Sequence, residues 1–363
     1  MIVLCIDAGS SSCKFGVYRN EELEPVRVFA GQLPANDDAD ALIDLVVRRL
    51  SSDACGGFAA VAHRLVFGGH AYVDPLIANE RVVRDLEALV PIEPLHLRAE
   101  LDLVNAAARR FPELPQVLCF DTAFHRSLPA VAKRLPLPAG LDPMLQRYGF
   151  HGLSYEYIVS RLPVDAGRTV VAHLGSGASL CAIRGGKPVE TTMGFSALGG
   201  LMMGTRPGDL DPGIVVRLLQ TGYDLDSLVN LFYYRSGLTG VSNSSPDVRV
   251  LLERSTADAQ AREAINLYVH ILRKQLGAMI AALGGIDSLV FTGGVGEHEP
   301  AIRSDACEPF AYLNCFIDAS ANARNDSIIS SGQSSVTVSV IPTEENLILA
   351  KHAFAQISVP APQ

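Results

Sequence analysis

Three glycine-rich segments carry the residue types that hold phosphate groups. Asp7–Ser12 follows an apolar run at 2–6, Gly175–Gly177 follows one at 169–172, and Thr292–Glu297 follows one at 288–291. Glycine lets the backbone approach a ligand closely, and successive N–H groups can converge on an anion. Each segment alone could be an ordinary turn, but three in one chain indicate nucleotide binding.

Two arginines lie among glycines. Arg64 precedes Gly68-Gly69, and Arg206 lies between Gly204 and Gly208. The guanidinium fork can bind two oxygens of a carboxylate or phosphate at once. A surface arginine is the alternative interpretation, and the flanking glycines favour a binding site for an anionic substrate.

Three further side chains suit phosphoryl transfer. Asp121 directly follows the apolar run 117–120, where sheet enzymes place a catalytic or metal-linked acid, although a helix N-cap is the competing interpretation. His151 could donate to a phosphoryl group, or be structural. Glu345 could hold Mg²⁺, a hard ion that prefers oxygen ligands, or begin a solvated helix.

The elements around these residues predict a duplicated domain. Segments 2–6 and 14–18 form one hairpin, segments 169–172 and 180–183 form another, and Gly185-Gly186 indicates the next hairpin turn. Apolar spacing predicts helices, and short apolar runs predict strands. The expected helices cover 39–50, 81–90, 97–110, 257–283 and the residues from 344, and the further strands cover 288–291 and 336–341.

Composition favours a cytoplasmic globular enzyme. The chain has 363 residues, enough for two domains, with 48% hydrophobic and 19% charged residues and a net charge of −9. No basic run supports nucleic-acid binding. Seven cysteines without a CxxC pair favour reduced thiols over disulfides or zinc. The N-terminus lacks signal-peptide features, and no apolar run is long enough to cross a membrane.

Several long motifs, in order along the whole chain, resemble the acetate kinase family. They are Asp7–Phe15, Arg64–Gly69, Phe120–His125, Arg147–Gly152, His173–Ser179, Met193–Phe195 with Gly199–Pro212, Phe291–Glu297 and Ile341–Glu345.

The resemblance implies an α/β fold of two ribonuclease-H-like domains, shared with sugar kinases, the Hsp70 ATPase and actin. We expect one domain at 1–121 plus 346–363 and a second, nucleotide-binding domain at 122–345, with the nucleotide in a cleft between them. The resemblance also implies a homodimer, ATP or ADP as co-substrate, and Mg²⁺ or Mn²⁺. The reaction it implies is reversible, direct in-line transfer of the γ-phosphoryl group of ATP to acetate.

Site residues follow from the same resemblance. Arg64, Asp121, His151, His173 and Arg206 are the implied catalytic residues. Arg64 is also implied to bind the substrate, whose acyl pocket would comprise Val66, Leu95, Phe150 and Ala197. Asp7 and Glu345 would hold the metal. The implied phosphate and nucleotide contacts are Ser10, Ser12, Lys14, Gly175, Ser176, Gly177, Asp247, Val248, Arg249, Gly293, Gly294, Val295, Gly296 and His298.

Three departures from the family pattern affect these expectations. Asp7 and Ser176 each replace a usual Asn in a phosphate turn. These changes affect the expected dependence on the metal ion and the expected choice of phosphoryl donor. Ala197 replaces a usual Pro in the acyl pocket. Because alanine is smaller, the pocket could accept one more methylene, a difference worth roughly 1–3 kcal/mol of discrimination.

Four alternatives follow. Propionate is a competitor to acetate, and the altered phosphate turns leave pyrophosphate open as the donor. A butyrate-type kinase resembles the chain more loosely, and the long 204–212 match opposes it. A nucleotide-binding module without catalysis is opposed by the presence of Arg64, Asp121, His151, Arg206 and Glu345.

Overall fold

The computed structural model describes residues 1–9, 12–34, 38–50, 57–138 and 140–358. The chain forms two compact units, the first comprising Met1–Arg126, Phe150–Tyr157 and Glu344–Gln363 and the second comprising Ser127–Gly149 and Ile158–Thr343. These units differ from the expected division at 121/122 and 345/346, chiefly because Phe150–Tyr157 packs with the first unit. There Phe150 stacks on Phe67, with ring centroids 6.3 Å apart.

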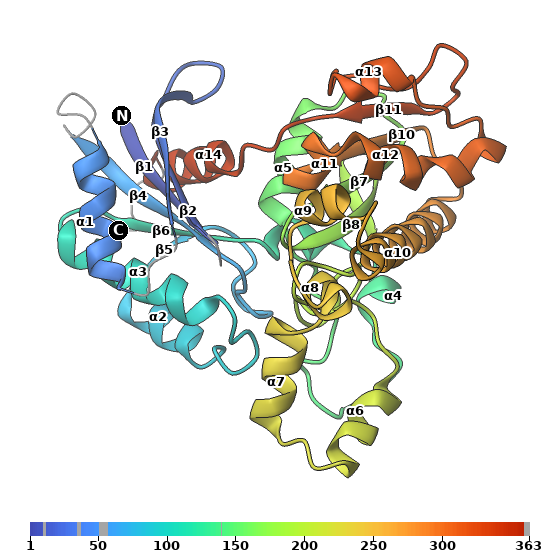
Figure 1. Cartoon of the computed structure of the whole chain (residues 1–363). Helices are drawn as coiled ribbons and strands as arrows, with labels where there is room; N and C mark the ends of the chain where they lie inside the picture. The colour runs from blue at the N-terminus through green and yellow to red at the C-terminus, as the bar shows by residue number, and fades with distance from the viewer. Residues whose placement is uncertain (10–11, 35–37, 51–56, 139, 359–363) are drawn as a thin grey trace. The chain divides into compact units, whose positions relative to one another are not determined.

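The first unit contains a six-stranded mixed sheet (Figure 1). Its order is β3 (Val26–Pro34), β2 (Ser12–Arg19), β1 (Ile2–Ala8), β4 (Phe58–Leu65), β6 (Gln116–Phe120) and β5 (Leu76–Ile77). β1, β2 and β3 form an antiparallel meander, whereas β4 runs parallel to β1 and β6 runs parallel to β4. The carboxyl ends of β1, β4 and β6 therefore meet at one edge of this sheet.

Helices cover both faces of this sheet because β1 is apolar on both sides. Leu4 and Ile6 pack in a cluster with side chains of α1 (Ala39–Arg49) and α3 (Leu97–Arg110). Val3 and Cys5 pack in another cluster, with side chains of α14 (Glu345–Ser358). Alternate strand residues point to opposite faces, so the continuous apolar run predicts a strand buried on both sides.

The second unit repeats this topology. Its sheet has the order β11 (Thr337–Val340), β10 (Ser288–Thr292), β7 (Arg168–Leu174), β8 (Ala178–Arg184) and β9 (Lys187–Thr191). β7, β8 and β9 are antiparallel, and β10 and β11 continue the sheet in parallel on the other side of β7. The two sheets thus share the ribonuclease-H-like strand pattern, which confirms the predicted fold class.

The predicted helix at 97–110 has the predicted bounds, and the long helix α10 (Ala259–Leu283) ends at Gly284 in the left-handed conformation, with φ 71°. The third glycine segment forms α11 (Gly293–His298) directly after β10. The other helices are α2 (Glu80–Glu87), η1 (Ala123–Ser127), α4 (Ala130–Lys133), α5 (Gly152–Arg161), α6 (Pro212–Gln220), α7 (Leu225–Tyr234), α8 (Gly237–Ser242), α9 (Val248–Arg254), α12 (Pro300–Cys307), η2 (Glu308–Leu313) and α13 (Ala319–Ala323). Within the described ranges, no helix has the length and apolarity needed to cross a bilayer.

Candidate active site

Strand order places Asp7, Arg64 and Asp121 together in the first unit. Asp7 is next to last in β1, Arg64 is next to last in β4, and Asp121 directly follows β6. The Asp121 N–H donates to the Leu65 carbonyl (2.9 Å), which extends the parallel pairing past the strand ends. Ligand sites of open α/β sheets lie at this carboxyl edge, so the topology favours a site here.

Arg64 is bound by buried carboxyl groups on several sides. Its Nε donates to Asp7 (2.5 Å), its Nη1 donates to Asp121 (2.9 Å), and its Nη2 donates to the Ala8 carbonyl. Nη2 also lies 3.5 Å from Glu100 Oε1. We call Arg64, Asp7, Glu100 and Asp121 the Arg64 cluster. The cluster fixes the guanidinium plane. Asp121 makes an ion pair here, and its carboxyl group also accepts from the Leu153 N–H in the first turn of α5, so the ion pair does not exclude the alternative capping role.

The charges of the Arg64 cluster are unbalanced. Burial raises the pKa of Glu100 to about 8, and Asp121 and Glu93 act in the same direction, while Arg64 and the Val66 N–H oppose the shift. Burial and Asp7 also raise the pKa of Asp121. Glu345, the first residue of α14, has its pKa raised to about 8 by desolvation, Asp7 and Asp121, whereas Arg64 and Lys14 oppose this. One guanidinium cannot offset the charge of all these acids at once, so the raised pKa values favour the protonated forms of Glu100 and Glu345 unless a further cation binds.

A divalent cation would correct this imbalance. Asp121 Oδ1 is buried without a hydrogen-bond partner among the described residues. The expected metal residues Asp7 and Glu345 lie near each other, since the charge of Asp7 raises the pKa of Glu345. Groups of three or more potential metal ligands are not found in the described part of the chain. Mg²⁺ uses one or two carboxylates with water and substrate phosphates, so these acids fit such an ion by charge and ligand chemistry.

Raising the pH should destabilise the protein through Glu100. Its folded-state pKa of about 8 lies above the ordinary 4.5, so the folded state keeps a proton that the unfolded chain loses between these values. The free energy of unfolding should therefore fall as the pH rises through this window, by on the order of 1–4 kcal/mol. Thermal unfolding across the window should show a shallower fall for Glu100→Gln than for wild type, and equal slopes would contradict this assignment.

His151 has a strained backbone beside Asp121. Its φ is 58°, in the left-handed region that a non-glycine residue adopts at a cost. The next residue, Gly152, donates its N–H to the Asp121 carbonyl (2.8 Å), and a Cβ there would lie 2.1 Å from that carbonyl oxygen. Glycine at 152 therefore permits the close approach that brings His151 to the loop after β6.

Three of the four expected acyl-pocket residues lie in the first unit. Val66 follows Arg64 after one residue and is buried, as is Phe150, whereas Leu95 is partly exposed. The fourth, Ala197, lies in the second unit and is also buried. The structure thus groups Val66 and Phe150 with the Arg64 cluster in one unit.

The second unit holds Arg206 in a tightly bonded loop. Arg206 is 7% exposed and its Nη1 donates to the Ala197 carbonyl (2.8 Å). The Arg206 carbonyl accepts from Met203 N (3.0 Å), and Gly204 N donates to Ser176 in the phosphate turn (3.2 Å). These bonds link the predicted catalytic arginine to the predicted acyl-pocket residue, and its loop to the turn at 175–177.

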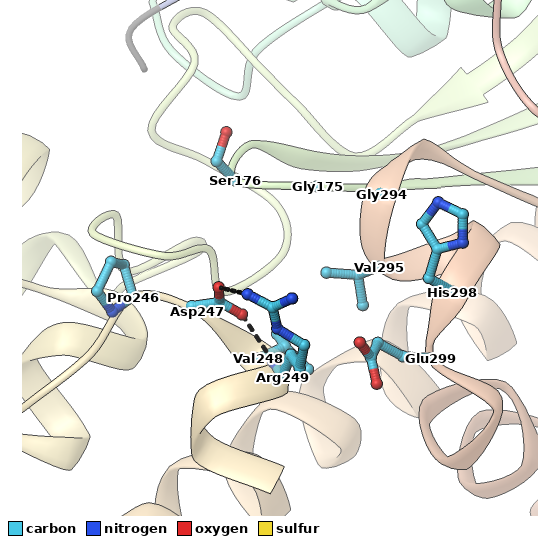
Figure 2. A pocket seen from close by; sticks show the side chains of 10 residues that line it. All are labelled: Gly175, Ser176, Pro246, Asp247, Val248, Arg249, Gly294, Val295, His298 and Glu299. Atoms are coloured by element: carbon cyan, nitrogen blue, oxygen red, sulfur yellow. Dashed lines mark hydrogen bonds and ion pairs between the residues drawn. The ribbon is translucent and has the colours of Figure 1, made fainter. Parts of the chain in front are cut away.

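A pocket of about 440 Å³ lies over the start of α11 (Figure 2). It is lined by Gly175, Ser176, Pro246, Asp247, Val248, Arg249, Gly294, Val295, His298 and Glu299. Asp247 caps α9 through the Arg249 N–H (2.8 Å), and its carboxylate also lies 3.5 Å from the Arg249 guanidinium. The predicted nucleotide residues at 175–176, 247–249, 294–295 and 298 are therefore brought together from three parts of the second unit.

Other predicted residues lie outside this pocket lining. Gly177 accepts from Gly175 N (3.0 Å) and closes the turn, and the Gly296 carbonyl accepts from the buried Arg303 (2.9 Å). Gly293 packs against Leu174, and His173 is buried at the end of β7. Ser12 and Lys14 begin β2, with Lys14 paired in register with Asp7. Ser10 lies outside the described residues.

Sequence reasoning missed Glu100, Pro246 and Glu299. Glu100 carries a detectable signal, because Leu97, Leu101 and Val104 lie at helical spacing around it and place it on the apolar face of α3. Pro246 and Glu299 are each adjacent in sequence to a predicted nucleotide residue, Asp247 and His298, and this adjacency was a usable signal for both.

The pocket beside a glycine-rich helix start in the second unit, and the largely buried Arg64 among metal-compatible acids in the first, are features that suit a phosphotransferase. Residues 29–351 match the model of the Acetokinase family. The chain belongs to this family. It is 41% identical to an acetate kinase of Rhodopseudomonas palustris over 97% of this chain and 98% of that protein. It is 39% identical to an acetate kinase of Methylocella silvestris, with 97% of each chain covered.

Solved structures agree with this assignment. The Porphyromonas gingivalis acetate kinase superposes with a TM-score of 0.85 at 30% identity, covering 98% of this chain and 99% of that one. A propionate kinase from Francisella tularensis superposes with a TM-score of 0.84 at 29% identity, covering 97% and 98%. The fold is therefore common to kinases named for two different short carboxylates.

Proposed function

We infer that the protein transfers the γ-phosphoryl group of ATP to acetate, reversibly, giving acetyl phosphate and ADP. The match to acetate kinases over 97% of the chain carries this inference. Its motifs include Arg64, Asp121 and Arg206, whose residue types suit the reaction.

The chemistry needs positioning and charge neutralisation more than acid–base catalysis. A carboxylate is already a nucleophile, so one of its oxygens can attack the γ-phosphorus directly while the bond to the ADP oxygen breaks. The transferring group spreads negative charge over three equatorial oxygens. Fixed cationic and hydrogen-bonding groups stabilise that charge without reorganising. This requirement supports direct in-line transfer.

Each side chain then has a role that its own surroundings support. Arg64 binds and orients the carboxylate, because its guanidinium plane is fixed by the Arg64 cluster. Arg206 stabilises the transferring phosphoryl group, with its orientation set by the Ala197 carbonyl. His151 and His173 donate hydrogen bonds to phosphoryl oxygens, and Asp121 orients Arg64 beside the acyl group.

Asp7 and Glu345 are the proposed Mg²⁺ residues. Bound Mg²⁺ would neutralise nucleotide phosphate charge, and the unbalanced acids beside Arg64 support its binding here. The carboxylate of Asp7 would otherwise repel phosphate, so this departure from the usual Asn makes activity more dependent on the ion.

The second unit's pocket is the proposed adenosine site, and enlarging Gly294 should test it. A Cβ at Gly294 meets no described atom within 4 Å, so a side chain there can enter the pocket without disturbing the fold. We expect Gly294→Val to raise the KM for ATP about tenfold or more while changing the KM for acetate little. Steady-state kinetics with each substrate varied will measure both constants.

Gly277 provides a matched control in the same unit. It lies in α10, away from the pocket lining, and a Cβ there also meets no described atom within 4 Å. Gly277→Ala should leave both KM values unchanged. An ATP KM that Gly294→Val does not alter would place the adenosine elsewhere.

Propionate is the second candidate substrate, because Ala197 is smaller than the usual Pro. Acyl phosphate can be trapped with hydroxylamine from Mg-ATP and acetate, propionate or butyrate in parallel. The highest kcat/KM with acetate supports acetate kinase activity, and a higher value with propionate would reassign the substrate. A discrimination of about tenfold to 200-fold is the scale expected from one methylene.

We also propose a cytoplasmic homodimer. The six cysteines in the described part of the chain are free and buried, in keeping with a reducing compartment. Helix α6 buries none of its residues, and Ile214, Val216 and Leu219 on it are each more than 40% exposed. Such an apolar surface supports association with a second copy. Sedimentation at several protein concentrations tests this, and a monomer throughout would contradict it.

A further inference from the structure

Glu100 is a buried carboxyl group that the proposed reaction leaves without a role. It lies in the first turn of α3 and is 3% exposed. A buried carboxyl in a helix that otherwise packs against the sheet through apolar side chains needs a specific partner, because burial penalises its charged form.

Glu100 contacts two proposed substrate-binding elements at once. Its Oε2 accepts from the Val66 N–H (2.8 Å), and its Oε1 lies 3.5 Å from Arg64 Nη2. Val66 directly follows the last residue of β4. Its N–H therefore donates to the Glu100 side chain of α3 and not to a neighbouring strand. That contact needs only a lone pair on Oε2, which the carboxyl group keeps whether or not it carries a proton.

Glu100 differs from Asp7 and Asp121 because the proposed reaction gives it neither the metal ion nor the acyl group to contact. Asp7 is a proposed metal residue, and Asp121 is proposed to act beside the acyl group. Asp121 Oδ1 and Glu100 Oε1 both make no hydrogen bond among the described residues, but Glu100 Oε1 faces Arg64 Nη2 at 3.5 Å. Glu100 comes from the helix behind the strand ends and holds both the guanidinium side chain and the backbone of the acyl pocket. It can therefore keep this geometry when the other two acids engage metal or substrate.

We propose that Glu100 is a positioning residue, which holds the Arg64 guanidinium and the Val66 backbone in the positions that bind the carboxylate substrate. This proposal rests on the proposed function for the reaction that it serves. The contact itself belongs to the protein before any ligand binds, which allows it to be tested separately.

Glu100→Gln tests the proposal with almost no change in volume. The glutamine carbonyl can accept from the Val66 N–H, but its NH₂ then faces Arg64 Nη2. Oε1 of Glu100 has a lone pair for Arg64 whether or not the carboxyl group is protonated, whereas an amide NH₂ has none, so in the variant two donors oppose each other. Small displacements of positioning groups can cost about 100-fold, and we expect kcat to fall about 10- to 100-fold. The KM for acetate should rise, and the KM for ATP should stay within about twofold because the adenosine pocket lies in the other unit.

Glu93→Gln is the matched control. Glu93 is also buried and lies just before α3, but its carboxylate bonds to His96 (3.1 Å). The Glu93→Gln variant should retain the wild-type kcat. A folded Glu100→Gln variant with wild-type kcat, or an equal loss in both variants, would overturn the proposal. If Glu100→Gln does not fold, Glu100→Asp replaces it, because the shorter side chain cannot make both contacts and should give the same pattern of constants.

A second readout needs no turnover. The rate at which phenylglyoxal modifies Arg64 in the ligand-free protein, followed by peptide mass spectrometry, should rise several-fold in Glu100→Gln. Arg64 keeps its bonds to Asp7, Asp121 and the Ala8 carbonyl, but the opposed NH₂ group at position 100 displaces Nη2 and loosens the guanidinium. An unchanged rate would overturn the proposal. Failure of the wild type to form acyl phosphate would instead refute the proposed function, and the labelling result would still decide the role of Glu100 in holding Arg64.

Discussion

Replacing Arg206 with alanine should lower kcat for acyl phosphate formation by about 10³-fold or more, the scale set by arginines that neutralise a transferring phosphoryl group. Arg206 is 7% exposed and held by the Ala197 carbonyl, so neither water nor a neighbouring side chain can readily take its place. Arg206→Lys should recover only part of the rate, because lysine keeps the charge and loses the planar fork. Hydroxylamine trapping measures both variants.

Arg254 offers a control for this experiment. It is an exposed arginine of the same unit and pairs with Asp258 (2.7 Å). Arg254→Ala should keep wild-type activity, and its unfolding temperature should change little because exposed ion pairs contribute only about 0–1 kcal/mol. An Arg206→Ala variant that is folded and fully active would show that the phosphoryl group is stabilised by other residues.

Replacing Arg64 with alanine should affect both activity and stability. It leaves the buried acids Asp7 and Asp121 without their counter-ion, a change that costs about 3–5 kcal/mol when one partner of a buried ion pair is removed. It also removes the proposed carboxylate-binding group, so kcat/KM for acetate should fall by about 10³-fold or more. Chemical denaturation and steady-state kinetics measure the two effects.

Arg109 separates these effects from the general loss of an arginine. It pairs with Asp40 at 2.7 Å on the exposed surface of the first unit, and the side chains are 60% and 65% exposed. Arg109→Ala should change the free energy of unfolding by less than about 1 kcal/mol and leave the kinetics unchanged. If Arg64→Ala is as stable as Arg109→Ala, the Arg64 cluster is not the buried network described above.

The sequence predicted the frame of this site because strand ends leave local signals. The apolar run at 117–120 ends at Asp121, the run at 2–6 ends at Asp7, and both residues lie at the carboxyl edge of one sheet. The helix at 97–110 was predictable because its apolar spacing is regular and its end is marked by Arg109-Arg110. These features depend on neighbours along the chain.

What the sequence did not predict depends on neighbours in space. Glu100 was hidden because an acid in the first turn of a helix is common where the helix dipole favours it, although its place on the apolar face of α3 was a usable signal. The ion pair of Arg64 with Asp121 joins residues 57 positions apart. The sequence around His151 did not predict its left-handed backbone conformation. That conformation accompanies the close approach of Gly152 to the Asp121 carbonyl.

The most direct test of the central claim is phosphorus NMR of the purified protein with Mg-ATP and acetate. We predict that, with acetate in large excess, the γ-phosphate signal of ATP falls to an equilibrium level while acetyl phosphate and ADP signals grow in equal amounts, and that Mg²⁺-free samples show no conversion. Intact ATP with acetate, or acetyl phosphate formed from pyrophosphate while ATP stays unchanged, would contradict ATP-dependent phosphorylation of acetate.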